Sequence, residues 1–217
     1  MFNIFSKDSR LKYNTAKHLE KYSTPSLDFF VLIFLSAGLA TTGLVLNSSA
    51  IIIGAMVVAP LVTPVFSFSL NLILFDLKKI IYAVLLILSG SLLAVIISFL
   101  LSHLIMFLEG REIIFTLEIL KRTKPNLIYF LMAIFSGMAG AYAYARPDLS
   151  ERIIGIAISA AIIPPLSVIG ISLAILKFDL FQSSLVLFLL NILGICFGSI
   201  FMFIVLGFGK NEAELKK

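Results

Sequence analysis

The chain has 217 residues, of which 60% are hydrophobic and 13% charged, with a mean hydropathy of +1.09 and a formal net charge of +5. Soluble domains carry roughly 25% charged residues, so this composition excludes an ordinary soluble globular protein and indicates an integral membrane protein. The basic residues flank apolar stretches instead of forming one basic surface. This distribution argues against nucleic acid as a partner and favours the lipid bilayer.

Six stretches without Asp, Glu, Lys or Arg are long enough to cross a hydrocarbon core of roughly 30 Å. In chain order they are residues 29–46, 50–75, 80–108, 127–145, 153–176 and 180–209. They predict an all-α, polytopic membrane protein with six transmembrane helices. On this topology, 12 of the 17 Lys and Arg residues fall on the side of the first residue and five on the other. The positive-inside rule therefore predicts a cell (cytoplasmic) membrane protein with both termini in the cytoplasm.

The stretches divide the chain into five parts. We expect a cytoplasmic or interfacial leader in residues 1–26, a first membrane repeat in 27–108, an interfacial helix or loop in 109–126, a second membrane repeat in 127–209 and a charged tail in 210–217. Within the central polar part, Ile113, Ile114 and Leu117 recur at helical spacing before Pro125, which favours an interfacial helix. Residues 47–49 join the first two spans in a tight hairpin, and we expect Asn47 and the serines to cap its helices.

The second half of the chain repeats the first about one hundred residues later. The aligned pairs are residues 21–30 with 121–130, Gly54 with Gly155, Pro64 with Pro165, and Phe75-Asp76-Leu77 with Phe178-Asp179-Leu180. A unit with three spans must insert the other way up the second time. Two inverted three-helix repeats are typical of transporter folds, because the mirrored halves can rock around a shared site.

Prolines interrupt the second and fifth predicted spans at matching positions of the two repeats. An interior proline removes a backbone hydrogen bond and costs about 3 kcal/mol or more, so we expect both helices to be broken. In lipid, non-helical backbone is tolerated only where it is buried or lines a cavity. The residues expected to line or shape a midplane path are Pro60, Thr63, Pro64, Ser67, Pro164, Pro165 and Ser167. The alternative interpretation is that these prolines are ordinary packing kinks.

Small residues cluster in the first, second, fourth and fifth spans. Those expected to allow close helix packing are Gly38, Gly54, Gly137, Gly140 and Gly155. We therefore expect these four spans to form a tight core, with the bulkier third and sixth spans outside. The same small-residue faces could join copies of the chain in a homo-oligomer.

No charged residue occupies the centre of any predicted span, so the chain lacks the buried carboxylate that usually relays protons or sodium ions. The positive ends of half-helices favour an anion or a neutral polar solute, although carbonyl coordination of a monovalent cation stays open. Asp76 and Asp179 are either entrance charges or solvated corners. No motif points to an enzyme, a cofactor or a metal site.

Several short motifs occur together in an order that matches a known family. They are Gly43-Leu44-Val45-Leu46-Asn47-Ser48, Ile53-Gly54-Ala55-Met56, Ala59-Pro60-Leu61, Thr116-Leu117-Glu118-Ile119, Arg122-Thr123-Lys124-Pro125, Gly137-Met138-Ala139-Gly140-Ala141-Tyr142-Ala143 and Ile163-Pro164-Pro165-Leu166. On these motifs, residues 23–208 resemble the prokaryotic uncharacterised hydrophobic proteins that share domain of unknown function 389. The resemblance implies a bacterial or archaeal membrane protein and brings no established substrate with it.

Two functions follow from these observations. The first is membrane transport of a small solute or ion, by a carrier or a channel, through a midplane site at the broken helices. The alternative is a non-transporting membrane scaffold or sensor that acts through oligomerisation. Transport requires a water-accessible route to the prolines, whereas a scaffold requires a dry, close-packed centre.

Overall fold

The computed structural model describes Thr15, residues 25–145 and residues 162–209. These residues contain eight helices and no strand, so the predicted all-α class is confirmed for the described part of the chain. The helices are α2 (Leu27–Val45), α3 (Ser49–Val58), α4 (Val62–Ile73), α5 (Leu77–Glu109), α6 (Leu117–Lys121), α7 (Leu127–Tyr144), α9 (Ile163–Ala174) and α10 (Phe178–Val205). Most of the predicted leader, residues 146–161 and the tail 210–217 lie outside the described residues.

Four of these helices, α2, α5, α7 and α10, are each long and apolar enough to cross a membrane. The pair α3 and α4, bent by 50° at its break, makes a fifth candidate span. Large apolar side chains on the outer faces stay exposed, as Leu88 at 60% and Phe197 at 63% show, which suits a surface in contact with lipid tails. The chain is therefore a multi-pass membrane protein.

The fifth predicted span is described only in its second half. That half is α9, whose 12 residues reach about 18 Å, too short to cross a bilayer alone. The remaining part of the predicted span falls in residues 146–161, outside the described residues. The described helices therefore account for four or five of the six expected spans.

The break between α3 and α4 follows from the two prolines around it. Ala59 has an extended backbone (ψ 123°), the conformation that a following proline imposes, so α3 ends just before Pro60. Pro64 is the third residue of α4, in the first turn, where its missing amide hydrogen would have had no acceptor within the helix. The predicted interruption of the second span is confirmed.

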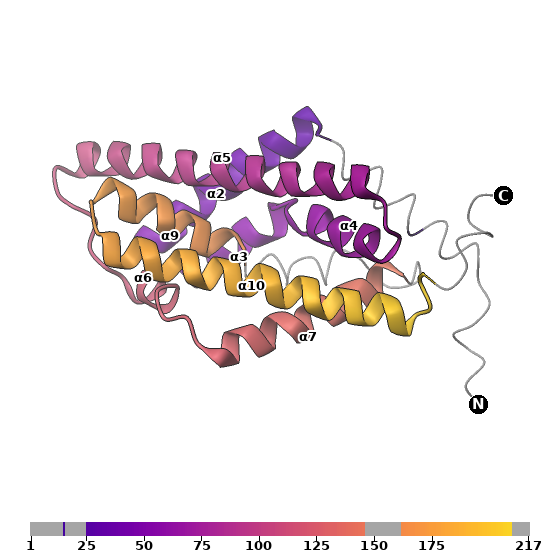
Figure 1. Cartoon of the computed structure of the whole chain (residues 1–217). Coiled ribbons are helices and arrows are strands. Elements are labelled where there is room, and N and C mark those ends of the chain that lie inside the picture. Colours follow the sequence, from indigo (N-terminus) through magenta and orange to yellow (C-terminus); the bar gives the residue numbers. More distant parts are fainter. Residues whose placement is uncertain (1–14, 16–24, 146–161, 210–217) are drawn as a thin grey trace.

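The two long helices α5 and α10 form the frame of the bundle. α4 packs against both of them, and so does α9. In Figure 1, α4 runs from the middle of the bundle to one end, whereas α9 runs from the middle to the opposite end. The expected core of the first, second, fourth and fifth spans is wrong for the fourth span, because the described contacts of α7 are mainly with α10. α7 is the peripheral span, packed mainly on α10.

The contact between α7 and α10 depends on glycine. A Cβ atom added at Gly137 would collide with the backbone carbonyl oxygen of Ile195, and one added at Gly198 would collide with that of Ile134. Gly140 is also buried on α7. Gly137, one of the predicted packing residues, lies at this contact, and its missing side chain lets the two backbones touch.

Two other predicted packing glycines behave differently. A Cβ atom at Gly38 or Gly54 would meet no described atom within 4 Å, so neither residue permits a close contact with another described helix. The prediction of interhelical packing was wrong for these two positions, because the presence of a glycine does not determine whether a neighbouring helix faces it. Gly155 lies outside the described residues.

We predict that Gly198→Ala destabilises the protein, because its new methyl group must displace the α7 backbone. Overpacking of this kind costs roughly 1–3 kcal/mol, measurable as a lower midpoint of thermal unfolding in detergent. Gly54→Ala is the matched control, since its methyl group enters open space. Equal midpoints for the two variants would contradict the close α7 to α10 contact.

Candidate functional site

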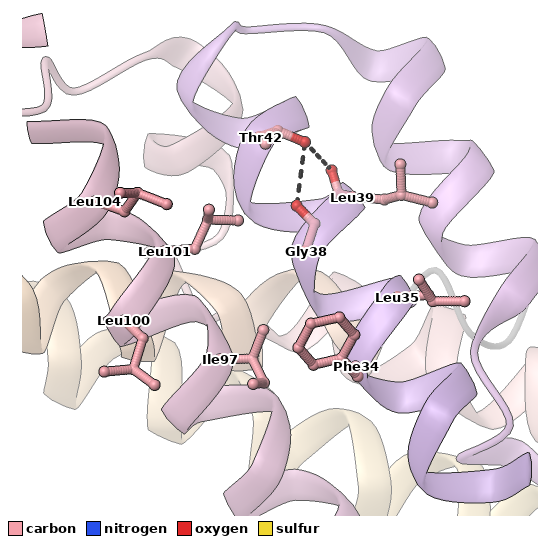
Figure 2. Close-up of a pocket in the computed structure, with 9 residues that line it drawn as sticks. All are labelled: Phe34, Leu35, Gly38, Leu39, Thr42, Ile97, Leu100, Leu101 and Leu104. Atoms are coloured by element: carbon pink, nitrogen blue, oxygen red, sulfur yellow. Dashed lines mark hydrogen bonds between the residues drawn. The ribbon is translucent and has the colours of Figure 1, made fainter. Parts of the chain in front are cut away.

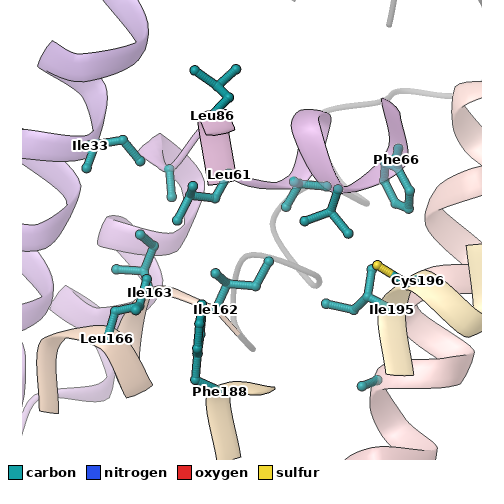
Figure 3. Close-up of a cluster of buried hydrophobic side chains, with 14 of the residues drawn as sticks. Ile33, Leu61, Phe66, Leu86, Ile162, Ile163, Leu166, Phe188, Ile195 and Cys196 are labelled. Carbon is teal, nitrogen blue, oxygen red and sulfur yellow. The ribbon is translucent and has the colours of Figure 1, made fainter. Parts of the chain in front are cut away.

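The candidate site lies where α4 and α9 begin. Leu61 and Val62 at the start of α4 belong to the same buried apolar cluster as Ile162 and Ile163 at the start of α9 (Figure 3). The first amides of any helix lack acceptors within the helix and carry partial positive charge. Both helix starts therefore bring hydrogen-bond donors into the interior of the bundle.

The predicted path residues of the second span lie around the break. Pro64 and Ser67 are buried, while Pro60 and Thr63 are half-buried. The Thr63 hydroxyl is 2.9 Å from the phenol oxygen of Tyr144 on α7, so this contact joins α4 to the first helix of the second repeat. Ser67 accepts a hydrogen bond from the side-chain amide of Asn71 at 3.2 Å. Neither Thr63 nor Ser67 was predicted to have these protein partners.

The predicted path residues of the fifth span occupy the start of α9. Pro164 and Pro165 are its second and third residues, so they begin the helix instead of kinking its interior. Ser167 is completely buried, and its hydroxyl has no hydrogen-bond partner among the described residues. The structure thus brings the two predicted sets to one apolar cluster, with hydroxyl groups and helix starts as the polar elements.

The two predicted entrance charges occupy different positions in their turns. Asp76 precedes α5 and accepts a hydrogen bond from the amide of Lys79 at 3.2 Å, whereas Asp179 is an exposed residue in the first turn of α10. The α4 to α5 turn and the α9 to α10 turn lie at opposite ends of the bundle (Figure 1).

The backbone geometry of the α4 to α5 turn and of the α9 to α10 turn shows which of their residues are equivalent. Phe75 and Leu176 both have a positive φ, of 53° and 54°. The next amide in each turn, that of Asp76 or Lys177, donates to a carbonyl five residues earlier, at 3.1 and 2.9 Å. The structure therefore places Lys177, not Asp179, at the position of Asp76, and the pairing of Phe75-Asp76-Leu77 with Phe178-Asp179-Leu180 needs correction.

A buried ionic cluster that was not predicted from the sequence lies on α6. The Glu118 side chain is 6% exposed, with Lys121 Nζ at 2.7 Å and an Arg122 nitrogen at 3.5 Å. The hydrogen bond from Lys121 lowers the pKa of Glu118 below its ordinary value of 4.5; the Ser49 hydroxyl and Arg122 act in the same direction, while burial opposes them. Glu118 is therefore held as a carboxylate at neutral pH.

This cluster fixes the hairpin between α2 and α3. Thr116 donates from its hydroxyl to the Leu44 carbonyl at 2.6 Å, and the Glu118 amide donates to the Asn47 side chain at 3.1 Å. Ser49, the first residue of α3, donates to the Glu118 carboxylate at 3.0 Å, so a negative charge from α6 sits at the positive start of α3. Asn47 and Ser49 were expected to cap their own helices and instead bind α6.

The predicted interfacial helix is shorter than expected. α6 has five residues, and Ile113 and Ile114 precede it in non-helical backbone. The spacing of Thr116, Glu118 and Lys121 was the only sequence pattern from which the cluster could have been predicted. It was not sufficient, because the partners of Thr116 and Glu118 lie about 70 residues earlier in the chain.

A similar contact occurs at the end of α7. The Thr15 hydroxyl donates to the Tyr144 carbonyl at 3.4 Å, just as Thr116 donates to Leu44 at the end of α2. Thr15 and Thr116 are 101 residues apart, the same separation as Pro64 and Pro165. Two threonines at this separation thus each donate a hydrogen bond to a carbonyl at the end of a helix.

We predict that Glu118→Gln destabilises the protein by about 1–3 kcal/mol, because it removes charge-assisted hydrogen bonds. A lowered pKa means that the stability contributed by Glu118 is fully present above pH 4.5 and is lost as pH falls through its value in the folded protein. Thermal unfolding in detergent between pH 7 and pH 3 tests this. The wild type should lose more stability on acidification than the variant, and parallel pH profiles would contradict the role of the carboxylate.

Comparisons with known proteins agree with the resemblance noted in the sequence. Uncharacterized protein MJ0678 of Methanocaldococcus jannaschii is 24% identical over 195 residues, which cover 90% of this chain and 58% of that protein. The chain thus spans less than two thirds of the length of this relative. No solved structure matches the chain. Residues 56–197 match the family described as "Domain of unknown function (DUF389)", and the chain belongs to that family.

Proposed function

We propose that the protein moves a small solute or ion across the membrane through a site at the starts of α4 and α9. One observation carries the proposal: two short helices, each with a proline as its third residue, begin at one interior cluster and run to opposite ends of the bundle (Figure 1). Interrupted helices at matching positions of two repeats are the arrangement that transporters use for midplane sites.

The proposal includes two inverted three-helix repeats, and helix crossings support it. Ser69 on α4 meets Ser199 on α10, with the two hydroxyl oxygens 2.7 Å apart. The residues 101 positions away from these two also meet, because a Cβ atom at Gly170 on α9 would lie 2.5 Å from the Ser98 Cβ on α5. Equivalent residues therefore make the α4 to α10 crossing and the α9 to α5 crossing.

The chemistry of the site favours a small anion or a neutral polar solute. The polar groups near the two helix starts are the hydroxyls of Thr63 and Ser167 and the first amides of the helices other than those of Pro64, Pro164 and Pro165, which carry no hydrogen; these hydroxyls and amides can donate hydrogen bonds. No carboxylate lies within α4 or α9 to bind a cation. Helix starts attract negative charge, whereas a multivalent cation would need acidic ligands.

The structure supports a carrier better than an open channel. Leu61, Ile162 and Ile163 are each at most 1% exposed, so apolar side chains close the described surroundings of the site (Figure 3). Solute access would then require the two halves to move relative to each other, which inverted repeats permit.

The same apolar closure favours a second candidate function. A scaffold or sensor needs a rigid, dry centre, and the cluster around Leu61 and Ile163 has that character. In this alternative, the interrupted helices serve only packing, and the outer faces bind partner proteins or further copies of the chain.

We predict opposite membrane sides for two turns. Single cysteines at Ser48 and Lys78, in a Cys196→Ala background, should react with impermeant thiol reagents added to opposite faces of oriented vesicles. These positions lie at the two ends of the α3 and α4 pair, which must cross the membrane in the proposed topology. Labelling of both cysteines from one face would contradict the inverted repeats.

We predict intermittent water access at Ser167→Cys, a completely buried position, in the same background. A conformation populated at 0.1–10% would give modification by a small charged thiol reagent at roughly that fraction of the rate of exposed Lys78→Cys. Ile33→Cys, at a fully buried core position, is the matched control. Proteoliposome flux of small anions and neutral polyols should fall after modification. Rates equal to the Ile33→Cys control, with no flux, would favour the scaffold.

A further inference from the structure

Two hollows follow one another along the seam between α2 and α5. The first has a volume of about 500 Å³ and is lined by apolar side chains, among them Phe34 on α2 and Ile97, Leu101 and Leu104 on α5 (Figure 2). Gly38 leaves space in its wall, because a Cβ atom there would meet nothing within 4 Å. The hollow is therefore a groove on the outer surface of the seam.

The groove offers no free polar group to an occupant. Its one hydroxyl, that of Thr42, lies 3.1 Å from the Gly38 carbonyl and 3.0 Å from the Leu39 carbonyl, so its hydrogen is already engaged (Figure 2). A hydrocarbon chain satisfies such a surface by apolar contact alone.

The second hollow continues the groove towards the end of α5. It has a volume of about 200 Å³ and is lined by Val45 and Leu46 on α2 and by Ile105 and Glu109 on α5, with Arg111 and Glu112 beside them. Val45 follows Thr42 by three residues, which is about 4.5 Å along a helix, and Ile105 directly follows Leu104. One seam thus passes from a wholly apolar groove to a charged pocket.

The pocket carries both signs of charge. The Arg111 guanidinium is 2.9 Å from the Glu109 carboxylate and its side chain is 64% exposed, so it can also bind an anion. Glu112 has no ion-pair partner among the residues that the structure describes. An occupant that matches these groups needs a phosphate for Arg111 and an ammonium for Glu112.

We propose that this seam binds one phospholipid with a phosphoethanolamine headgroup, one of its two acyl chains in the groove and its headgroup in the pocket. A primary ammonium donates three hydrogen bonds to carboxylates, whereas the quaternary ammonium of a choline lipid donates none. A lipid with a net negative charge should bind less well, because the pocket has two carboxylates and only one guanidinium. This inference does not depend on the proposed transport function.

Native mass spectrometry of the purified full chain tests the proposal. The protein is mixed in turn with phosphatidylethanolamine, phosphatidylcholine and phosphatidylglycerol of identical acyl chains. The wild type should retain one phosphatidylethanolamine at least about ten-fold more tightly than the other two lipids. Gly38→Leu should lose most retention of all three lipids because its side chain fills the groove, and Glu112→Gln should reduce phosphatidylethanolamine to the level of phosphatidylcholine.

Two controls keep the result specific. Gly54→Leu places the same side chain at another open glycine, and Lys78→Gln removes an exposed charge at the other end of α5; both should retain phosphatidylethanolamine as the wild type does. Glu112→Gln changes an exposed residue in non-helical backbone, so it tests the headgroup even if Gly38→Leu folds poorly. Equal retention of the three lipids would overturn the proposal. A dimer that Gly38→Leu converts to monomer, without lipid loss, would also overturn it and identify a second copy as the occupant.

Discussion

A hydrocarbon layer offers no hydrogen-bond partner to a backbone amide or carbonyl, and this constraint decides where a membrane helix can be interrupted. The break around Pro60 is consistent with it, because Leu61 is 1% exposed and Ala59 is 9% exposed. The uninterrupted helices α5 and α10 pack on α4 and separate it from lipid. The long spans therefore act as the walls that make the interrupted span possible.

The ends of the spans are held by short interfacial contacts. α6 binds the end of α2 through Thr116 and the start of α3 through Glu118. Its next residue, Arg122, accepts a hydrogen bond at its carbonyl from Ser184 on α10, at 3.0 Å. A displacement of α3 would therefore be transmitted to α6 and, through Arg122, to α10. In a carrier, this chain of contacts would couple the interrupted span to the opposite repeat.

Hydropathy and proline predict much of this fold because both act locally. Residues 80–108 were expected to span the membrane, and α5 runs from Leu77 to Glu109. The end of α3 before Pro60 likewise depends only on neighbouring atoms. Contacts between helices were harder to predict, as Gly38 and Gly137 show: the same residue type faces open space in one case and a backbone carbonyl in the other.

The candidate site shows the same division between local and distant effects. The two proline-bearing helix starts were predicted, whereas the closing apolar side chains and the partner of Thr63 were not, since Tyr144 lies 81 residues later in the chain. The alignment of Asp76 with Asp179 was wrong because it relied on the shared Phe-Asp-Leu sequence. The positive φ of Phe75 and Leu176 shows that these two residues are the equivalent positions of the two turns. Backbone conformation therefore aligns these two turns better than side-chain identity does.

The two equivalent helix crossings differ in a way that bears on motion. Gly170 brings α9 against the α5 backbone, where a Cβ atom would lie 2.6 Å from the Val95 carbonyl oxygen, so little sliding is possible there. At the other crossing, Ser69 and Ser199 meet through one hydrogen bond, and such bonds contribute only about 0.6 kcal/mol between membrane helices. The α4 to α10 crossing is thus the easier of the two to rearrange. If the halves move during transport, α9 would travel with α5, and α4 would shift against α10 by breaking one weak hydrogen bond and rearranging the apolar packing around it.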